Sequence, residues 1–150
     1  MLDSRHIGHV LTPHRAVVEA GRLRFFAKAT GQSDPVYFDQ AAAEAAGYPA
    51  LLAPPTFLFC LELDAPQRGE AYRLLDIGFQ RILHGEQRFD YRGPVFAGDV
   101  LDYASRIADI YVKRSRSGGE LGFLEIETTV SKADGQAVAE LRRITVVRPA

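Results

Sequence analysis

The chain has 150 residues, of which 47% are hydrophobic and 25% are charged, and this composition excludes a disordered protein. Its length predicts one domain spanning residues 1–150, with a core large enough to need no disulfide or metal for support. The 18 basic and 19 acidic residues are intermixed, and the net charge of −1 provides no positive surface for nucleic acid or an anionic membrane. We therefore expect neither of these as a partner.

The single cysteine, Cys60, lies in an apolar run and excludes an internal disulfide. We expect it to be a small buried hydrophobic residue and not a nucleophile. His6, His9 and His14 have no metal-ligand spacing to a cysteine or a pair of carboxylates, so neither a metal nor another cofactor is expected. The amino terminus lacks the apolar core of a secretory signal, and no run of about 18 apolar residues occurs. A cytoplasmic protein is therefore predicted.

The first half of the chain is predicted to be mainly helical. The expected elements are a short strand at 16–19 and helices at 21–30, 41–46, 56–63 and 70–78. Gly31 and Gly47 close the first two helices, because glycine accepts the left-handed conformation that follows a helix end. Pro54 and Pro55 open the third helix, since proline is tolerated in the first turn and not further inside. Residues 56–63 are apolar on all sides, so this helix is expected to be buried.

The second half is predicted to consist of strands. From Arg81 onward the hydrophobic pattern has a period of two. One face of this strand is expected to carry Ile82, His84, Glu86, Arg88 and Asp90. Further strands are expected at 100–113, 121–132 and 137–148, with turns at 98–99, 117–119 and 133–136. The last turn contains Asp134-Gly135, a pair favoured in two-residue hairpin loops. An apolar helix followed by long antiparallel strands predicts the α+β class, with a sheet wrapped around a long central helix.

Three blocks of sequence carry a resemblance to a known family. They are residues 26–39 with the alanines 41–43, residues 47–57, and residues 83–99. In this order and spacing they resemble the MaoC-like acyl-thioester dehydratases and hydratases, and in particular the FAS1-like, or dehydratase N-terminal-type, branch, which includes non-catalytic subunits. The resemblance implies a hot-dog fold that pairs with a second hot dog to give a continuous sheet. It also implies an acyl-CoA or acyl-ACP thioester as the ligand.

The segment that should carry the chemistry departs from the family pattern. Active members have a loop of the form Gly-Asp-x-Asn-Pro-x-His, whose aspartate and histidine hold the reacting water. The matching residues here are Gly31-Gln32-Ser33-Asp34-Pro35-Val36-Tyr37. Gln32 cannot accept a proton at neutral pH, and Tyr37 is a poor base because a tyrosine pKa is near 10. The glycine and proline of the loop are kept, whereas its titratable pair is absent.

Two titratable residues remain as weak catalytic candidates. Asp34 is either a displaced base with Tyr37 as proton donor, or a turn residue bonded to its own backbone. His84 either contacts the thioester or the partner's loop, or is a structural histidine. Tyr37 either packs under its loop or lines an acyl channel. The residues that the resemblance places at the substrate are Gln32, Tyr37, Pro55, Thr56, Phe57, His84 and Gly85.

The expected function is an acyl-binding subunit of an enoyl-thioester hydratase, in a homodimer or heterodimer, with the catalytic Asp and His supplied by a partner chain. Two alternatives stay open: a hydratase active by itself through Asp34 or His84, and a non-enzymatic homodimer that binds acyl thioesters. A thioesterase would need a carboxylate on the central helix, which offers only Glu62 and Asp64 near its end.

A small basic cluster follows the second predicted strand. It contains Lys113, Arg114 and Arg116. These charges either meet the phosphates of coenzyme A or an acidic carrier protein, or they are solvated loop charges.

Overall fold

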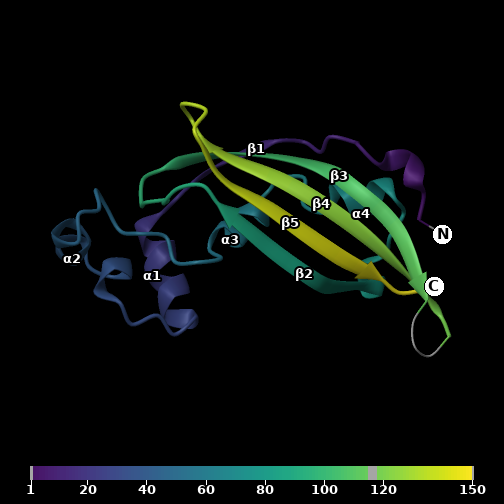
Figure 1. Ribbon diagram of the computed structural model, residues 1–150, viewed down its shortest axis with the longest axis horizontal. Coiled ribbons are helices and arrows are strands. Elements are labelled where there is room, and N and C mark those ends of the chain that lie inside the picture. The colour runs from purple at the N-terminus through teal and green to yellow at the C-terminus, as the bar shows by residue number, and fades with distance from the viewer. Residues whose placement is uncertain (1, 115–117, 150) are drawn as a thin grey trace.

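The computed structural model describes residues 2–114 and 118–149 and contains a five-stranded antiparallel sheet (Figure 1). The strands are β1 (His14–Val17), β2 (Ile82–Tyr91), β3 (Val100–Arg114), β4 (Glu120–Lys132) and β5 (Ala137–Val147). Their order in the sheet is β1-β3-β4-β5-β2, so β1 and β2 are the edges. The three long strands expected in the second half therefore lie side by side in the middle of the sheet. Ser117, in the turn expected at 117–119, and Arg116 of the basic cluster lie outside the described residues.

The turn between β4 and β5 differs from the two-residue loop that was expected. The Lys132 N–H donates to the Gln136 carbonyl, and the Gly135 N–H donates to the Lys132 carbonyl, both at 2.8 Å. Three residues therefore lie between the paired positions, and the last of them, Gly135, has φ 87°. The Asp-Gly pair is used in a three-residue loop whose glycine takes the left-handed position.

β2 does not keep one face along its length, which corrects the single face expected from its alternation. His84 pairs with Thr145 and Glu86 with Ile144, so Gly85 is an extra residue on the β2 side of the ladder. A bulge of this kind reverses the alternation beyond it. Ile82 and His84 consequently face the helices before the bulge, and after it Gln87, Phe89 and Tyr91 do so, while Arg88 and Asp90 face the other way.

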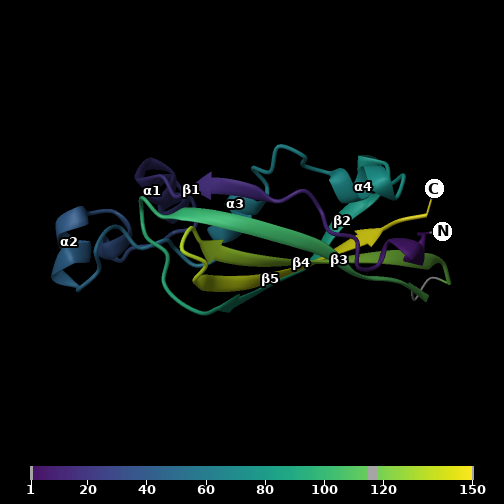
Figure 2. The ribbon, with the colours of Figure 1, turned by 90° about the horizontal axis from the view of Figure 1, so that it is seen from above.

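The helices lie to one side of the sheet or beyond its end. They are α1 (Ala20–Ala29), α2 (Gln40–Ala45), α3 (Leu58–Glu62) and α4 (Glu70–Leu74), with short 3-10 turns at Ser4–His6, Pro35–Tyr37 and Phe79–Arg81. Figure 2 shows α1, α3 and α4 on the same side of the sheet, with α2 beyond one end. No helix among the described residues is long and apolar enough to cross a membrane.

The central helix α3 is shorter than the helix expected over residues 56–63. It begins only at Leu58 because Thr56, with φ 70°, is not in a helical conformation. It ends at Glu62, four residues before Pro66, and the residue before a proline is itself disfavoured in a helix.

Side chains of the sheet hold α3 in place. The Tyr103 hydroxyl donates to the Leu58 carbonyl at 3.1 Å, and His14 Nε2 donates to the Leu61 carbonyl at 2.9 Å. The His14 and Tyr103 rings stack with their centres 4.8 Å apart. Leu58 and Leu61 are at most 1% exposed and belong to the larger hydrophobic core, which also includes residues of α1 and the sheet. A second core cluster lies around Ala71 of α4 and the opposite end of the sheet.

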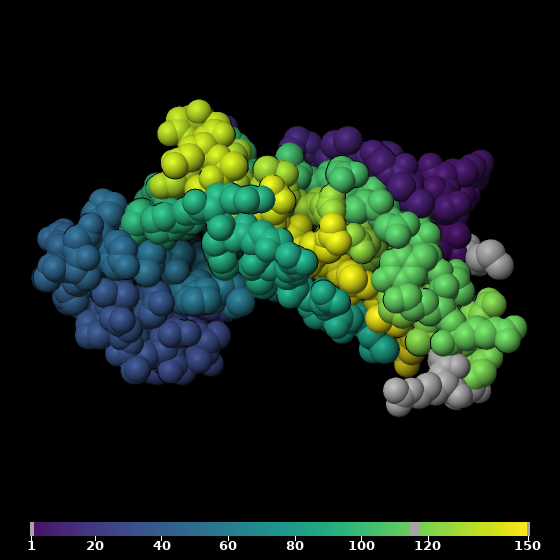
Figure 3. All heavy atoms as spheres, in the orientation of Figure 1, coloured from purple at the N-terminus to yellow at the C-terminus, as the bar shows by residue number. Residues whose placement is uncertain are grey.

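The opposite face of the sheet is not covered by helices, as Figure 3 shows. Across it, Arg106 and Arg142 each lie 2.5 Å from a Glu127 oxygen, and Arg142 also lies 3.3 Å from Glu125. The two arginine side chains are about half exposed, so these pairs contribute little to stability.

Candidate functional site

The family-like loop is folded as a turn that follows α1. Gly31 has φ 72°, and the Gln32 N–H donates to the Ala27 carbonyl at 2.9 Å, so this backbone closes the helix. Asp34 Oδ1 accepts a hydrogen bond from the Val36 N–H at 3.1 Å and caps the short turn at Pro35–Tyr37. Asp34 thus makes the bond of a turn aspartate to its own backbone.

Two of the expected substrate-contacting residues, Tyr37 and Pro55, line one cavity of about 440 Å³, which we call the proline cavity. Its lining consists of Tyr37, residues 52–55, Leu58 and residues 91–95. The cavity therefore lies where the family-like loop, the start of α3 and the end of β2 meet. Burial raises the pKa of Tyr37 further, which keeps its phenol protonated and makes it unsuitable as a base.

A hydrogen bond from Thr56 positions the hydroxyl of Tyr91, which lines the proline cavity. The Thr56 N–H donates to the Tyr91 hydroxyl oxygen at 2.9 Å. The φ of 70° at Thr56 is exceptional for a β-branched residue and identifies a strained position. Burial raises the pKa of Tyr91, so its hydroxyl stays protonated. Because the oxygen accepts from the Thr56 amide, its own hydrogen is free to donate to a ligand carbonyl.

Phe57 and Gln32 do not line the proline cavity. Phe57 is 1% exposed, and its ring lies edge-on to Phe26 at 5.5 Å, with the Arg22 guanidinium 5.9 Å from its centre. It therefore packs α1 against α3. The Gln32 N–H donates to the Ala27 carbonyl, so its backbone lies in the turn that follows α1.

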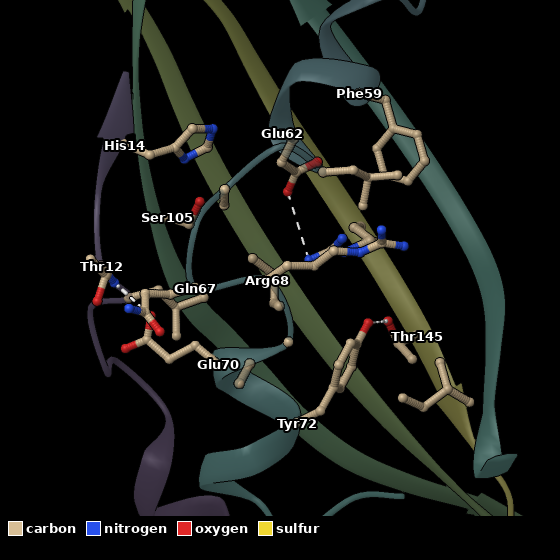
Figure 4. Close-up of a pocket in the computed structure, with 18 of the residues that line it drawn as sticks. Thr12, His14, Phe59, Glu62, Gln67, Arg68, Glu70, Tyr72, Ser105 and Thr145 are labelled. Carbon is tan, nitrogen blue, oxygen red and sulfur yellow. Dashed lines mark hydrogen bonds and ion pairs between the residues drawn. The ribbon is translucent and has the colours of Figure 1, made fainter. Parts of the chain in front are cut away.

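His84 lines a second cavity of about 230 Å³, beside the end of α3 and the start of β2 (Figure 4). We call it the polar cavity, because Glu62, Ser105, Arg143 and Thr145 are among the side chains that line it. The His84 ring lies 5.5 Å from the Phe59 ring. Tyr72 closes one side through a 3.1 Å hydrogen bond between its hydroxyl and Thr145 Oγ1.

Of the expected site residues, Tyr37 and Pro55 line the proline cavity and His84 lines the polar cavity, and these cavities share α3 and β2. The other four line neither cavity: Gln32, Thr56, Phe57 and Gly85. Gly85 forms the bulge that turns His84 toward one cavity and Tyr91 toward the other. Sequence reasoning missed Tyr91 and Arg143, because a tyrosine or arginine in an alternating strand gives no signal of its own. Glu62 was expected only as a carboxylate that a thioesterase could use, and not as part of a polar cavity.

The basic cluster has little connection to either cavity. Lys113 Nζ lies 4.9 Å from the centre of the Tyr111 ring and 5.3 Å from that of Phe123, while Arg114 is the last residue of β3. Residues 2–114 and 118–149 contain no group of three or more His, Cys, Asp or Glu side chains suited to a metal ion.

Comparison with known sequences identifies a family and several relatives. The profile of the family described as FAS1-like, dehydratase domain region, matches residues 5–141. A UPF0336 protein of Streptomyces coelicolor is 36% identical over 151 residues, covering 99% of this chain and 97% of that protein. A UPF0336 protein of Thermobifida fusca is 36% identical over 127 residues, covering 85% of this chain and 80% of its own length.

Solved structures with the same arrangement confirm the expected α+β hot-dog fold. A chain in the crystal structure of the C-terminally truncated HadBC (3R-hydroxyacyl-ACP dehydratase) complex from Mycobacterium tuberculosis matches with a TM-score of 0.77 and 29% identity. The match covers 94% of this chain and 96% of that chain. A protein described as a MaoC-like dehydratase matches with a TM-score of 0.81 and 25% identity, covering 97% of this chain and 43% of that one.

Proposed function

The chain belongs to the FAS1-like dehydratase family, within the MaoC-like dehydratases, and on this premise we propose that it is the acyl-thioester-binding subunit of an enoyl-thioester hydratase. The reacting water would be held by an aspartate and a histidine of a partner chain. The similar chain in the HadBC complex is itself part of a two-component assembly, which supports a partner of this kind.

The observation that carries the proposal is a family-like loop that keeps its glycine and proline while other residues fill its acid and base positions. Hydration of an enoyl thioester needs a base to activate water and an acid to protonate the adjacent carbon. Gln32 and Tyr37 occupy the two positions, and neither is a base at neutral pH. Asp34 is engaged by its own backbone.

The proline cavity suits the thioester end of the ligand. Its walls are mostly apolar, and the Tyr91 hydroxyl provides one donor for the thioester carbonyl. A few placed polar groups in an apolar pocket are typical of ligand sites. The subunit would act in the cytoplasm, where the lone Cys60 thiol stays reduced.

Two alternative functions are less well supported by the geometry. A hydratase that acts alone would need Asp34 or His84, but Asp34 caps its own turn and His84 lines the other cavity. A non-enzymatic acyl-binding homodimer would use the same cavities. It differs from the proposed subunit only because adding a partner chain would never produce hydration of the bound thioester.

The test is hydration of crotonyl-CoA and a longer enoyl-CoA, followed as loss of enoyl-thioester absorbance. We expect the wild-type chain to be inactive and the Gln32→Asp/Tyr37→His variant to hydrate the substrate, because it restores the family's pair on an existing scaffold. Gln32→Asn/Tyr37→Phe is the matched control and should stay inactive. Turnover by the pure wild-type chain would contradict the proposal, as would failure of that chain to bind any acyl-CoA.

A further inference from the structure

The polar cavity contains a buried carboxylate that is only partly satisfied by the protein. The Glu62 side chain is 5% exposed and points from α3 into the cavity (Figure 4). Its Oε1 accepts a hydrogen bond from Thr128 Oγ1 at 3.1 Å. Its Oε2 is buried without a hydrogen-bond partner among the described residues. A buried carboxylate oxygen in this state is costly unless something donates a hydrogen bond to it.

Arg143 faces the same cavity from β5. Its Nη2 atom lies 3.8 Å from Glu62 Oε1, which is an ion pair too long to be a hydrogen bond. Its buried Nε has no acceptor among the described residues, and the side chain is 15% exposed. A guanidinium has five N–H donors and no acceptor, so Arg143 presents donors to the cavity while Glu62 presents an acceptor.

Gln87 extends this polar group along the sheet. It is the cross-strand partner of Arg143, so the two side chains share the face that is turned toward α3. Both polar atoms of its amide are buried without a partner in the part of the chain that the structure describes. Glu62 at the end of α3 and the paired Arg143 and Gln87 on the sheet therefore all carry unsatisfied polar atoms.

The two cavities lie beside opposite ends of the same helix and the same strand. The proline cavity is lined by Leu58 at the start of α3 and Tyr91 at the end of β2. The polar cavity is lined by Glu62 at the end of the same helix and by His84 near the start of the same strand. The seven residue steps from His84 to Tyr91 span on the order of 20 Å of strand, a length that a medium or long acyl chain can follow.

A purely alkyl chain would fit these surroundings poorly. It would exclude water from Glu62 and Arg143 without replacing the hydrogen bonds that water makes. A hydroxyl group donates one hydrogen bond and accepts others, which is what the free Glu62 oxygen and the Arg143 N–H groups require. Sites built to hydrogen-bond a hydroxyl discriminate strongly against ligands that lack it.

We propose that the polar cavity is a second subsite that recognises a hydroxyl group carried by the distal part of the acyl chain, through Glu62 as acceptor and Arg143 as donor. The inference rests on the proposed acyl-thioester-binding function and narrows its substrate class from plain alkyl thioesters to oxygenated ones. Gln87 is the cross-strand neighbour of Arg143, and both polar atoms of its amide are buried without a partner among the described residues.

The test measures dissociation constants of the full-length chain by calorimetry for matched coenzyme A thioesters. The ligands are decanoyl-, dodecanoyl- and tetradecanoyl-CoA, each paired with its terminally hydroxylated counterpart. We expect at least one hydroxylated thioester to bind ten times more tightly than the plain thioester of the same length, and Glu62→Leu/Arg143→Met to abolish that preference. Removing both charges together avoids leaving one of them buried and unpaired.

Two further variants keep the result interpretable. Glu62→Gln preserves the side-chain shape and the bond from Thr128, and it should reduce the preference several-fold. It provides the test if the double variant does not fold. Arg15→Met/Asp102→Leu removes an exposed ion pair on β1 and β3 and should leave the preference unchanged. Circular dichroism reports folding of each variant.

The possible failures are distinguishable. Equal affinity for plain and hydroxylated thioesters at every length would overturn the hydroxyl subsite and leave the acyl-binding function standing. A preference that persists in Glu62→Leu/Arg143→Met would overturn the assignment to this cavity. Failure of wild type to bind any of the six thioesters would overturn the acyl-binding function and the subsite with it.

Discussion

At the scale of single residues, the backbone of Thr56 is the clearest strain in the molecule. Holding a non-glycine residue in the left-handed region costs roughly 1–2 kcal/mol. Thr56→Gly is therefore expected to raise the free energy of unfolding by about 1 kcal/mol, less than the full strain because glycine makes the unfolded chain more flexible. Thr56→Ala keeps the Cβ and serves as control, with a change within about 0.5 kcal/mol. Urea denaturation measures both, and equal effects of the two substitutions would show that φ at residue 56 is not strained.

The Tyr91 hydroxyl is predicted to contribute to ligand affinity. Tyr91→Phe removes its hydrogen bond to the ligand carbonyl and should weaken acyl-CoA binding by about tenfold, equivalent to about 1.4 kcal/mol. Burial raises the pKa of Tyr91 above the usual value near 10, so the hydroxyl stays protonated and affinity should be constant between about pH 7 and about pH 9. Calorimetric titration tests both statements, with Tyr111→Phe, outside both cavities, as control. An unchanged affinity in Tyr91→Phe would remove this residue from the site.

At the scale of elements, the bulge at Gly85 decides which side chains of β2 reach the two cavities. A Cβ added to Gly85 would lie 2.9 Å from Val146 Cγ2 and 3.0 Å from the Ile144 carbonyl oxygen. Gly85→Ala should therefore lower the free energy of unfolding by about 1–3 kcal/mol, the usual effect of overpacking. Gly93→Ala is the control, because its added Cβ meets nothing within 4 Å. Thermal unfolding of the two variants gives the comparison, and a Gly85→Ala protein as stable as Gly93→Ala would mean that the bulge tolerates a side chain.

The elements also show which parts of the fold could be predicted from the sequence. Helices, strands and their order were predictable because the hydrophobic period and the prolines at 54 and 55 are local signals. The bulge was not predictable, since it depends on Val146 and Ile144 of another strand, and without it the alternation of β2 predicts the wrong face for Gln87 and Tyr91. The five-residue length of α3 likewise follows from the backbone of Thr56, which its residue type does not favour.

The candidate site was predictable only in part for the same reason. Tyr37 and Pro55 could be placed by the family-like blocks, and the structure brings them together in one cavity. Tyr91 and Arg143 reach the cavities through strand register, which a single sequence does not reveal. The pairing of Arg143 with Gln87 beneath α3 is a property of tertiary packing alone.

At the scale of the whole molecule, the hot-dog fold predicts pairing with a second hot dog. β2 is an edge strand, and Leu83 on it and Phe79 just before it are 49% and 64% exposed. An uncovered edge with large apolar neighbours is favourable for association. We expect the pure chain to sediment with twice the mass of one chain at micromolar concentration. A single-chain mass across the accessible concentration range would contradict pairing between copies of this chain.

The central claim is that this chain binds an acyl thioester without converting it. Equilibrium dialysis of the wild-type chain against trans-2-dodecenoyl-CoA, followed by chromatographic analysis of the bound thioester, tests binding and chemistry in one sample. We expect the thioester to accumulate on the protein side and to be recovered as the unchanged enoyl form. Recovery of the 3-hydroxyacyl form, or equal thioester concentrations on both sides of the membrane, would contradict it.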